Sequence, residues 1–217
     1  MIAPDAEIDE EKRAAAEAAA ELVQDGMAVG LGTGSTVAHL LPALARRELD
    51  LRCVATSPRT EAAAHELGIA VEPFETLDRL ELAIDGADQV APGGWLVKGG
   101  GGAHTREKIV AAAAERFVVI ADSSKPVDSI APPVPLELHP FGLRATMREV
   151  GQVRLRNALP SPDGGVIADY HGEVGDPATL AERLAAIPGV VEHGLFPPAL
   201  VSEVLIARGA EIERLRF

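Results

Sequence analysis

The segment KGGGGAHTREK, residues 98–108, combines residue types that can bind and rearrange a polar small molecule. Four consecutive glycines disfavour helix and strand, because glycine loses more backbone entropy on ordering than other residues, but they let the backbone approach a ligand closely. An apolar pair precedes them and a helix-forming run follows, so the segment is predicted to lie between a strand and a helix N-terminus, where anions bind well. Glu107 lies between two cations that can tune its pKa, and it is our candidate for a catalytic base.

A second glycine-rich segment, GLGTGST at 30–36, also follows a short apolar run. Its glycines are spaced G-x-G-x-G, and Ser35 stands where the dinucleotide fingerprint has its third glycine, so a nicotinamide site is not expected. Backbone N–H groups and the hydroxyls of Thr33, Ser35 and Thr36 suit a single phosphate. The alternative is a tight turn in which Ser35 or Thr36 caps the following helix.

Three further polar segments follow strand-like runs: TSPRT at 56–60, DGAD at 85–88 and DSSK at 122–125. TSPRT is either a helix-capping turn or a ligand contact. Asp85 and Asp88 can face one pocket if their loop turns tightly, with one ionised while the other holds a proton. The alternative for this pair is an Asp-Gly turn with solvated carboxylates. The lysine that ends DSSK can reach a bound phosphate as a point charge.

Metal and disulfide chemistry are not expected. No histidine stands in metal-ligand spacing with the two aspartates, and only His104 of the six histidines adjoins a candidate segment. The single cysteine, Cys53, has no partner for an internal disulfide and fits a reduced, cytoplasmic setting. The acidic first ten residues and the absence of long apolar windows predict neither a secretory signal nor a membrane span.

Composition limits the classes of partner. The 217-residue chain is 47% hydrophobic, which indicates a globular protein, and its net charge of −13 argues against general affinity for nucleic acid or anionic membranes. Only four residues are lysines, and three of these fall between positions 98 and 125. That clustering indicates a local need for positive charge in the region of the candidate segments.

The elements that must position these segments alternate between strand and helix. Strands are expected at 27–31, 51–55, 69–71, 82–84 and 117–121, and helices at 9–24, 37–44, 60–67 and 105–115. This alternation predicts an α/β fold with a Rossmann-like, mainly parallel sheet, in which ligands bind beyond the carboxyl ends of the strands. The five polar segments should therefore converge on one edge of that sheet.

Prolines gather after residue 125, and a different pattern follows. Strands are expected at 134–138, 152–157, 166–170 and 190–195, and helices at 142–150 and 177–187. The order β-α-β-β-α-β predicts a smaller ferredoxin-like α+β domain. We therefore expect residues 1–130 and 200–217 to form the Rossmann-like catalytic domain and residues 131–199 the ferredoxin-like domain, with the apolar run at 201–207 returning to the first.

Taken in order, the segments GLGTGST, TSPRT, AIDGAD, KGGGGAHTREKIVA, ADSSK and IPGVVEHGLF resemble the motif set of ribose-5-phosphate isomerase type A, over about residues 10–209. The resemblance implies interconversion of D-ribose 5-phosphate and D-ribulose 5-phosphate in the pentose phosphate pathway, without a metal or organic cofactor, by a homodimer or homotetramer. The residue chemistry agrees, because moving a carbonyl from C1 to C2 needs a base, stabilisation of the enediolate oxygens and help in opening the ring.

The resemblance also implies roles for individual residues. Glu107 matches the family's base, Lys98 the cation that stabilises negative charge, and Asp85 and Asp88 the residues linked to ring opening and proton handling on O1 and O2. The phosphate-binding residues it implies are Thr33, Gly34, Ser35, Thr36 and Lys125, and those bordering the sugar are Thr60, Gly99, Gly100 and Gly101.

This sequence departs from the family pattern in three places. Gln89 replaces a usual glutamate after DGAD, His104 replaces a usual leucine after the tetraglycine segment, and the segment 128–135 is short. Two other functions stay open: a sugar-phosphate-sensing module without turnover, and a CoA transferase. The sensing module is the less expected, because the first 25 residues supply no helix-turn-helix pattern.

Overall fold

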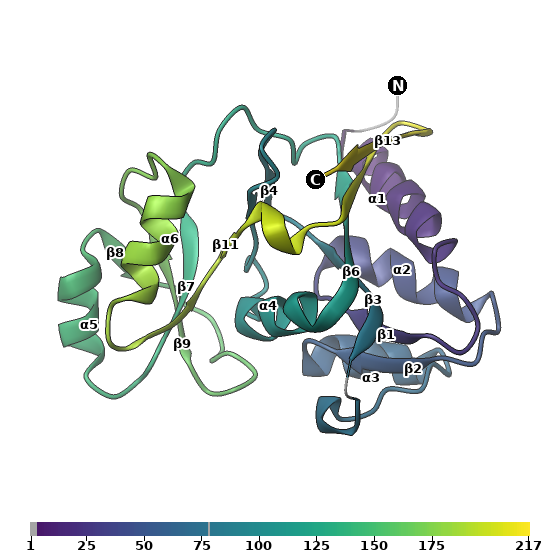
Figure 1. Ribbon diagram of the computed structural model, residues 1–217, viewed down its shortest axis with the longest axis horizontal. Helices are drawn as coiled ribbons and strands as arrows, with labels where there is room; N and C mark the ends of the chain where they lie inside the picture. The colour runs from purple at the N-terminus through teal and green to yellow at the C-terminus, as the bar shows by residue number, and fades with distance from the viewer. Residues whose placement is uncertain (1–3, 78) are drawn as a thin grey trace. The chain divides into compact units, whose positions relative to one another are not determined.

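The computed structural model describes residues 4–77 and 79–217, which form two compact units (Figure 1). Unit 1 comprises the chain up to Ala87, Arg106–Lys125 and Ala199–Phe217; unit 2 comprises Asp88–Thr105 and Pro126–Pro198. The elements of unit 1 are α1 (Pro4–Ala20), β1 (Ala28–Leu31), α2 (Ser35–Ala45), β2 (Arg52–Ala55), α3 (Pro58–Glu66), η1 (Phe74–Thr76), β3 (Leu80–Gly86), most of α4 (His104–Ala113), β6 (Ala114–Asp122), β12 (Glu203–Arg208) and β13 (Glu211–Arg216).

The core of unit 1 is a six-stranded sheet in the order β13-β12-β6-β3-β1-β2. Every neighbouring pair is parallel except β12 with β13, so the predicted Rossmann-like, mainly parallel sheet is confirmed. Strand β1 is apolar throughout, and β3 and β6 contain apolar runs at 82–84 and 117–121, as expected where helices cover both faces of a parallel sheet. From β1 the chain adds β2 on one side of the sheet and then β3, β6 and β12 on the other. The order of strands thus reverses between β1 and β3, and ligands bind at such a switch point in sheets of this kind.

Alternation along β1 assigns helices to the two faces of this sheet. Val29 and Leu31 pack in one apolar cluster with alanines of α1 and leucines of α2. Gly30 lies between them and so points to the other face, where a Cβ at Gly30 would lie 2.4 Å from Cγ1 of Val110. Helix α4 therefore packs closely against β1, and only glycine leaves room for it.

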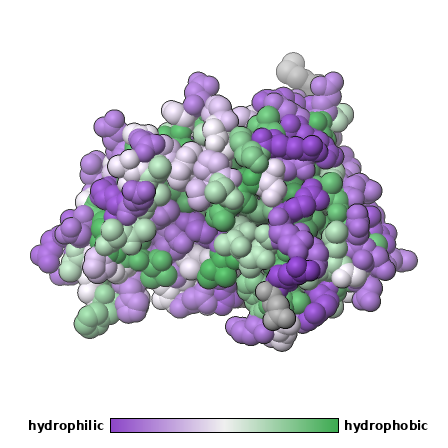
Figure 2. Space-filling model, in the orientation of Figure 1, coloured by the Kyte–Doolittle hydropathy of each residue, from purple (hydrophilic) through white to green (hydrophobic). Residues whose placement is uncertain are grey.

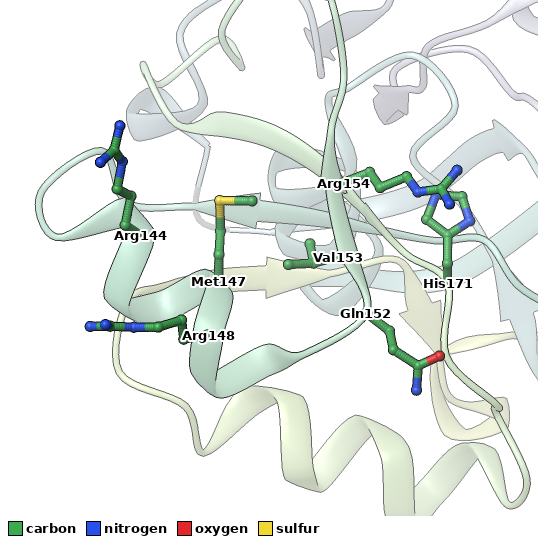
Figure 3. A pocket seen from close by; sticks show the side chains of 7 residues that line it. All are labelled: Arg144, Met147, Arg148, Gln152, Val153, Arg154 and His171. Atoms are coloured by element: carbon green, nitrogen blue, oxygen red, sulfur yellow. The ribbon is translucent and has the colours of Figure 1, made fainter.

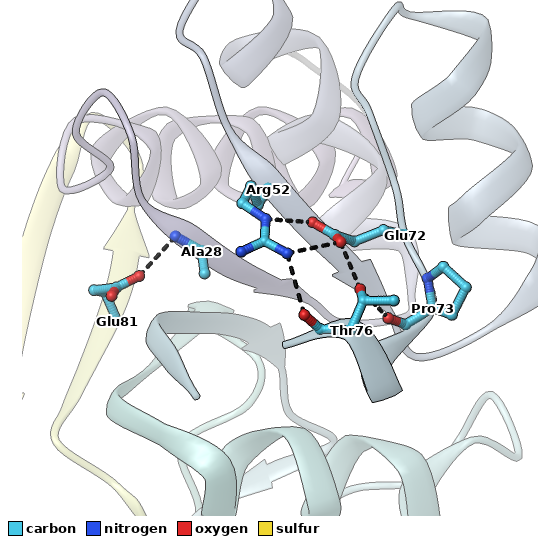
Figure 4. Close-up of polar contacts among 6 residues, drawn as sticks. All are labelled: Ala28, Arg52, Glu72, Pro73, Thr76 and Glu81. Atoms are coloured by element: carbon cyan, nitrogen blue, oxygen red, sulfur yellow. Dashed lines mark hydrogen bonds and ion pairs between the residues drawn. The ribbon is translucent and has the colours of Figure 1, made fainter. Parts of the chain in front are cut away.

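The prediction of a strand at 69–71 is wrong. Val71 forms a single bridge with Cys53, and no ladder follows. Two backbone hydrogen bonds, from Cys53 to Ala70 and from Glu72 to Cys53, hold the segment beside β2. A side-chain contact adds to them: Nε and Nη2 of Arg52 donate to the two carboxylate oxygens of Glu72 at 2.7 and 2.9 Å (Figure 4). Hydrogen bonds from Arg52 and Thr76 hold the pKa of Glu72 below its ordinary value.

Unit 2 contains a four-stranded antiparallel sheet in the order β10-β7-β9-β8. Its elements are β4 (Gln89–Val90), β5 (Leu96–Val97), β7 (Val134–Leu138), α5 (Leu143–Val150), β8 (Val153–Leu155), β9 (Val166–Tyr170), α6 (Pro177–Ala185), β10 (Val190–His193) and β11 (Leu195–Phe196), and η2 (Pro198–Leu200) leads back to unit 1. The succession β7-α5-β8-β9-α6-β10 in this strand order is the expected ferredoxin-like arrangement. Its core joins Leu136 and Leu138 of β7 to Leu180 and Leu184 of α6.

The compact units differ from the predicted domain boundaries at two segments and at Ala199, which belongs to unit 1. Residues 88–105 and 126–130 belong to unit 2, although the sequence placed them in the Rossmann-like domain. The reason is a three-stranded sheet in which β5 pairs with β4 on one side and β11 on the other. The apolar pair of β5 was expected as a strand before the glycines. As separate strands, β4 and β11 were not predicted, because a two-residue run carries little periodicity, and β13 was not predicted either.

Hydrophilic side chains cover much of the drawn face, as the acidic composition suggests (Figure 2). Among the described residues, no helix has the length and apolar character needed to cross a membrane.

Candidate active site

The loop after β1 has the form of a phosphate-binding turn. Its first N–H group, from Gly32, donates to the carbonyl of Ile84 at 2.9 Å, which continues the ladder between β1 and β3. Helix α2 then begins at Ser35, with Gly34 at the N-cap and no side-chain cap. The alternative in which Ser35 or Thr36 caps this helix is therefore not what the structure contains. The first N–H groups of α2 therefore have no side-chain cap, and such groups at a helix N-terminus can bind an anion.

A cluster of hydroxyl groups from the TSPRT segment contacts this loop and holds it in place. The Thr33 hydroxyl lies 2.8 Å from those of Thr56 and Ser57 and 3.3 Å from that of Thr60. The Thr60 hydroxyl also donates to the carbonyl of Gly32 at 2.9 Å. Ser57 caps α3 by accepting from the N–H of Thr60. The TSPRT segment thus is a capping turn, and it also supports the neighbouring loop.

Asp85 is buried at the end of β3 and shapes the same loop. One of its oxygens, Oδ1, accepts from the N–H of Thr33 at 3.0 Å and from that of Gly86 at 2.7 Å. A Cβ at Gly32 would lie 1.9 Å from the carboxyl carbon of Asp85. The second glycine of GLGTGST is therefore required because a carboxylate fills the space that a side chain would need.

Glu107 lies in the first turn of α4 with only 3% of its surface exposed. It precedes Val110 by three residues and shares its helix face. Since Val110 packs against Gly30 of β1, this face of α4 lies against the sheet. The candidate base is thus a buried carboxylate within unit 1, on the helix face that covers the strand preceding the phosphate-type loop.

The DSSK segment follows β6 and is tightly held. Oδ1 of Asp122 accepts from the N–H of Ser124 at 3.0 Å, and the N–H of Lys125 donates to the carbonyl of Asp122. The carboxylate of Glu11, from α1, accepts from the N–H groups of Ser123 and Gly209 at 2.9 and 2.7 Å. GTGST, TSPRT, Asp85 and DSSK therefore all follow carboxyl ends of strands in one parallel sheet, as predicted.

The tetraglycine segment does not belong to that sheet, which corrects the expectation that all five segments would. It follows β5 of the three-stranded sheet in unit 2 because Leu96 and Val97 pair with β4 and β11. Lys98 is 2% exposed, its N–H donates to the carbonyl of Gly194 at 2.9 Å, and its Nζ lies 5.4 Å from the ring centroid of Phe196. A buried ammonium group over an aromatic face is held in a fixed position.

Asp88 is exposed, unlike Asp85, and lies at the start of unit 2. Its N–H donates to the carbonyl of Val97, and its Oδ2 accepts from the N–H of Gly100 at 2.8 Å. The structure therefore joins Asp88 to the tetraglycine loop, which closes in a turn from Gly99 to Gly102. The solvated-turn alternative does not describe either aspartate fully, since each accepts from the backbone of a candidate loop.

Two of the three departures from the family pattern, Gln89 and His104, have structural roles within unit 2. The Gln89 amide donates to the carbonyl of Ala131 at 2.7 Å and accepts from its N–H at 2.9 Å, a double contact that a carboxylate could not make. His104 is fully buried, and its Nε2 lies 3.4 Å from the carbonyl oxygen of Glu192. A Cβ at Gly99 would lie 2.7 Å from Nδ1 of His104, so this imidazole packs against the glycine loop.

Several residues that support the site were missed by the sequence analysis. They are Glu11, Glu137, Arg156 and Asp169. Glu137 is buried and accepts from the hydroxyls of Thr105, in the first turn of α4, and Ser161. A charged residue in the middle of an expected apolar strand, as at 137, was the available signal.

Among the described residues, neither one cavity in unit 2 nor the grouping of possible metal ligands points to another site. A cavity of about 800 Å³ in unit 2 is lined by Arg144, Met147, Arg148, Gln152, Val153, Arg154 and His171. None of these is a predicted site residue, and the Arg144 and Arg148 side chains point away from Arg154 and His171 (Figure 3). Within the part of the chain that the structure describes, no three His, Cys, Asp or Glu side chains are grouped to hold a metal ion.

Comparison with known proteins places this chain in a family. The family model described as ribose 5-phosphate isomerase A (phosphoriboisomerase A) matches residues 52–211. A second model, the DeoR C terminal sensor domain, matches only residues 7–70, and the matches give no support to a sensing module or a CoA transferase as the function.

Similar proteins cover nearly the whole chain. The chain is 45% identical to ribose-5-phosphate isomerase A of Rhodopseudomonas palustris (strain HaA2), over 90% of this chain and 93% of that protein. The crystal structure of ribose 5 phosphate isomerase A from Neisseria gonorrhoeae has a TM-score of 0.92, with 34% identity over 96% of this chain and 97% of that one. A D-ribose-5-phosphate isomerase solved in complex with phospho-erythronic acid has a TM-score of 0.91, with 32% identity over 97% and 99% of the two chains. This chain belongs to the ribose 5-phosphate isomerase A family.

Proposed function

We propose that this protein interconverts D-ribose 5-phosphate and D-ribulose 5-phosphate through an enediolate. Its similarity to isomerases of that name over about nine tenths of the chain carries the proposal. The local geometry supports it, because unit 1 combines a phosphate-type loop with a buried carboxylate on the helix that covers β1. A relative that binds a phosphorylated sugar acid supports the same class of ligand.

In the proposed reaction, the sugar ring opens first, with O1 losing a proton and the ring oxygen gaining one. Glu107 then takes the proton from C2, and the electron pair moves to give an enediolate between C1 and C2. Delivery of that proton to C1, with transfer of the O2 proton to O1, leaves a ketone at C2. Glu107 suits the base role because a carboxylate can accept a proton from carbon and this one is buried away from water.

We assign the remaining roles as follows. Lys98 stabilises the negative charge of the enediolate oxygens, and its burial strengthens that interaction. Asp85 and Asp88 handle the protons of ring opening and of O1 and O2. The phosphate is bound by Thr33, Gly34, Ser35, Thr36 and Lys125, and the sugar is bordered by Thr60, Gly99, Gly100 and Gly101.

The test is formation of ribulose 5-phosphate from ribose 5-phosphate by purified protein in the presence of EDTA, because the proposed steps require neither a metal nor an organic cofactor. A folded sample without turnover would overturn the isomerase proposal. The Glu107→Gln variant should lose at least about 10²-fold in kcat while still binding substrate.

The matched control is Glu61→Gln, which changes an exposed glutamate in the first turn of α3. It should keep normal kcat. A Glu107→Gln variant as active as this control would move the base role to another residue.

We also propose that the protein is a cytoplasmic homodimer or homotetramer. Phe141 and Leu159 are each 87% exposed, and an apolar side chain left in water favours association. Cys53 is a buried free thiol, and burial raises its pKa to about 12, so it suits a reducing compartment and takes no part in the chemistry. Light scattering coupled to gel filtration measures the mass, and a monomer would contradict the oligomer.

A further inference from the structure

One guanidinium group in unit 2 has contacts that the proposed reaction steps do not explain. Nε and Nη2 of Arg156 donate to the two carboxylate oxygens of Asp169 at 2.7 and 2.6 Å. Its Nη1 donates to the carbonyl oxygens of Gly99 and Gly100 at 2.8 and 3.1 Å. The carboxylate thus holds one edge of the guanidinium so that the other edge faces the tetraglycine loop.

An ordinary cross-strand ion pair accounts for only half of this arrangement. Asp169 lies on β9, and the N–H of Arg156 donates to the carbonyl of Ile167 on the same strand, so the pair stabilises the edge of the antiparallel sheet. That role does not require the contacts of Nη1. Gly99 precedes Arg156 by 57 residues and lies outside this sheet.

The contacts of Nη1 set the orientation of two peptide groups. In a trans peptide the N–H points opposite to the C=O. Fixing the Gly99 carbonyl therefore directs the N–H of Gly100 toward Asp88, to which it donates at 2.8 Å. Fixing the Gly100 carbonyl turns the N–H of Gly101 away from the guanidinium. Gly99 has φ of 111°, a conformation with little intrinsic preference for one peptide orientation.

We propose that Arg156, held by Asp169, is a positioning residue for the isomerase reaction. It fixes the Gly99 and Gly100 peptide groups, and through them the Asp88 carboxylate and the chain beside Lys98. This inference rests on the proposed function, in which Asp88 and Lys98 act on the sugar. Arg156 itself touches no reacting atom, so its loss should slow proton transfer and leave the phosphate loop of unit 1 unchanged.

The first experiment compares Arg156→Ala with Arg154→Ala, which removes an exposed arginine from β8 two residues earlier. For Arg156→Ala, kcat should fall roughly 10- to 10²-fold, the size expected for a small misplacement of catalytic groups. KM should stay within about threefold, because phosphate binding is retained. The Arg154→Ala variant should match the wild type, and equal kcat values for the two variants would overturn the proposal.

Rescue separates positioning from a general loss of folding. Added guanidinium ion, at concentrations that do not denature the wild type, should restore part of the kcat of Arg156→Ala, whereas ammonium ion should not. Arg156→Lys should remain impaired because one ammonium group cannot hold Asp169 and two carbonyls together. Rescue by ammonium or by lysine would overturn the geometric role.

A last measurement does not depend on turnover. Hydrogen exchange of a peptide spanning residues 98–103 should be at least about tenfold faster in Arg156→Ala, and faster to a lesser extent in Asp169→Asn, with exchange in β1 and α2 unchanged. Unchanged exchange in 98–103 would overturn the anchoring. An inactive wild type would instead overturn the proposed function, and the exchange result alone would decide whether Arg156 fixes the loop.

Discussion

The two glycine-rich loops of this protein are held in different ways. The loop after β1 continues the ladder of a parallel sheet through the N–H of Gly32, and its further contacts come from Asp85 at the end of β3 and Thr60 in the first turn of α3. The tetraglycine loop follows a two-residue strand and is fixed by Arg156 and Asp88, from separate segments of the chain. A glycine-rich loop thus takes its shape either from the sheet that it ends or from side chains outside its motif.

The largest loss of activity is expected from Gly32→Ala, which tests whether the loop after β1 depends on its place at the end of the sheet. The new methyl group would overlap the Asp85 carboxyl, so either the loop or the carboxylate must move. We expect kcat/KM to fall on the order of 10²-fold, since misplacing reacting groups by about 1 Å has effects of that size. Gly93→Ala is the control, because a Cβ there meets no atom within 4 Å. Equal activity of the two variants would show that side chains outside the ladder can hold this loop too.

Lys125→Ala tests whether unit 1 needs a side-chain charge in addition to its backbone amides. A hydrogen bond to a charged group is worth about 1.5–3 kcal/mol, which corresponds to a rise in KM of at least roughly tenfold. Steady-state kinetics should show that rise with a smaller change in kcat. Lys12→Ala, in α1, supplies a control of the same residue type. An unchanged KM would remove Lys125 from the phosphate site.

A smaller effect is expected from Thr33→Val, which removes the hydroxyl in contact with Thr56, Ser57 and Thr60. Each lost hydrogen bond has a net effect of about 0.5–1.5 kcal/mol, so KM should rise severalfold and the midpoint of thermal unfolding should fall by a few degrees. The double variant with Thr60→Val should be less impaired than the sum of the single ones. Full additivity would mean that the hydroxyls do not act as one cluster.

The smallest effect, on stability, is expected from changing Glu11. Like Arg156 in unit 2, Glu11 is a charged side chain that binds backbone groups of distant segments. Burial alone would raise the pKa of Glu11, but hydrogen bonds from Ser123 and Gly209 and the charge of Arg208 outweigh it and hold the pKa below its ordinary value. Its contribution to stability is therefore present above the ordinary glutamate pKa of about 4.3 and is lost as pH falls through the lower folded-state pKa.

The measurement is the free energy of unfolding of Glu11→Gln and wild type between neutral and acidic pH. The variant should be less stable at neutral pH, and the difference should shrink below about pH 4. Glu10→Gln, at an exposed neighbour, should show no such pH-dependent difference. A constant difference at every pH would contradict the electrostatic account.

The sequence predicted those elements of the fold that a short apolar run or a local motif marks. Apolar runs located β1, β3, β6 and β12, and the β-α-β-β-α-β order of unit 2 was visible from its turns. The apolar pair of β5 was recognised as strand-like, but β4 and β11 were missed, and the pairing of β5 with β11 joins segments far apart in the chain. For the same reason the sequence assigned the tetraglycine loop to the wrong sheet.

The residues of the candidate site also fall into two groups, those that local motifs revealed and those that they did not. Thr33, Asp85 and Lys98 were found because motifs carry them, and Gly32 was recognised as part of a turn. Arg156, Asp169 and Glu11 belong to no motif, and an arginine on a predicted strand looks like any solvated charge. Their contacts span 13 to 198 residues of the chain, a separation that no periodicity reports.

The position of β12 between β6 and β13 has a consequence for how the protein is made. On the ribosome, β6 emerges about eighty residues before its partner, Glu203–Arg208. During that interval the nascent sheet has an open apolar edge, which can pair with other chains. Gly209, whose N–H donates to the Glu11 carboxylate, also emerges after β12. The loop that carries Lys125 therefore reaches its final anchoring only after Gly209 has emerged from the ribosome, and nascent chains that stop before Gly209 should lack tight phosphate binding.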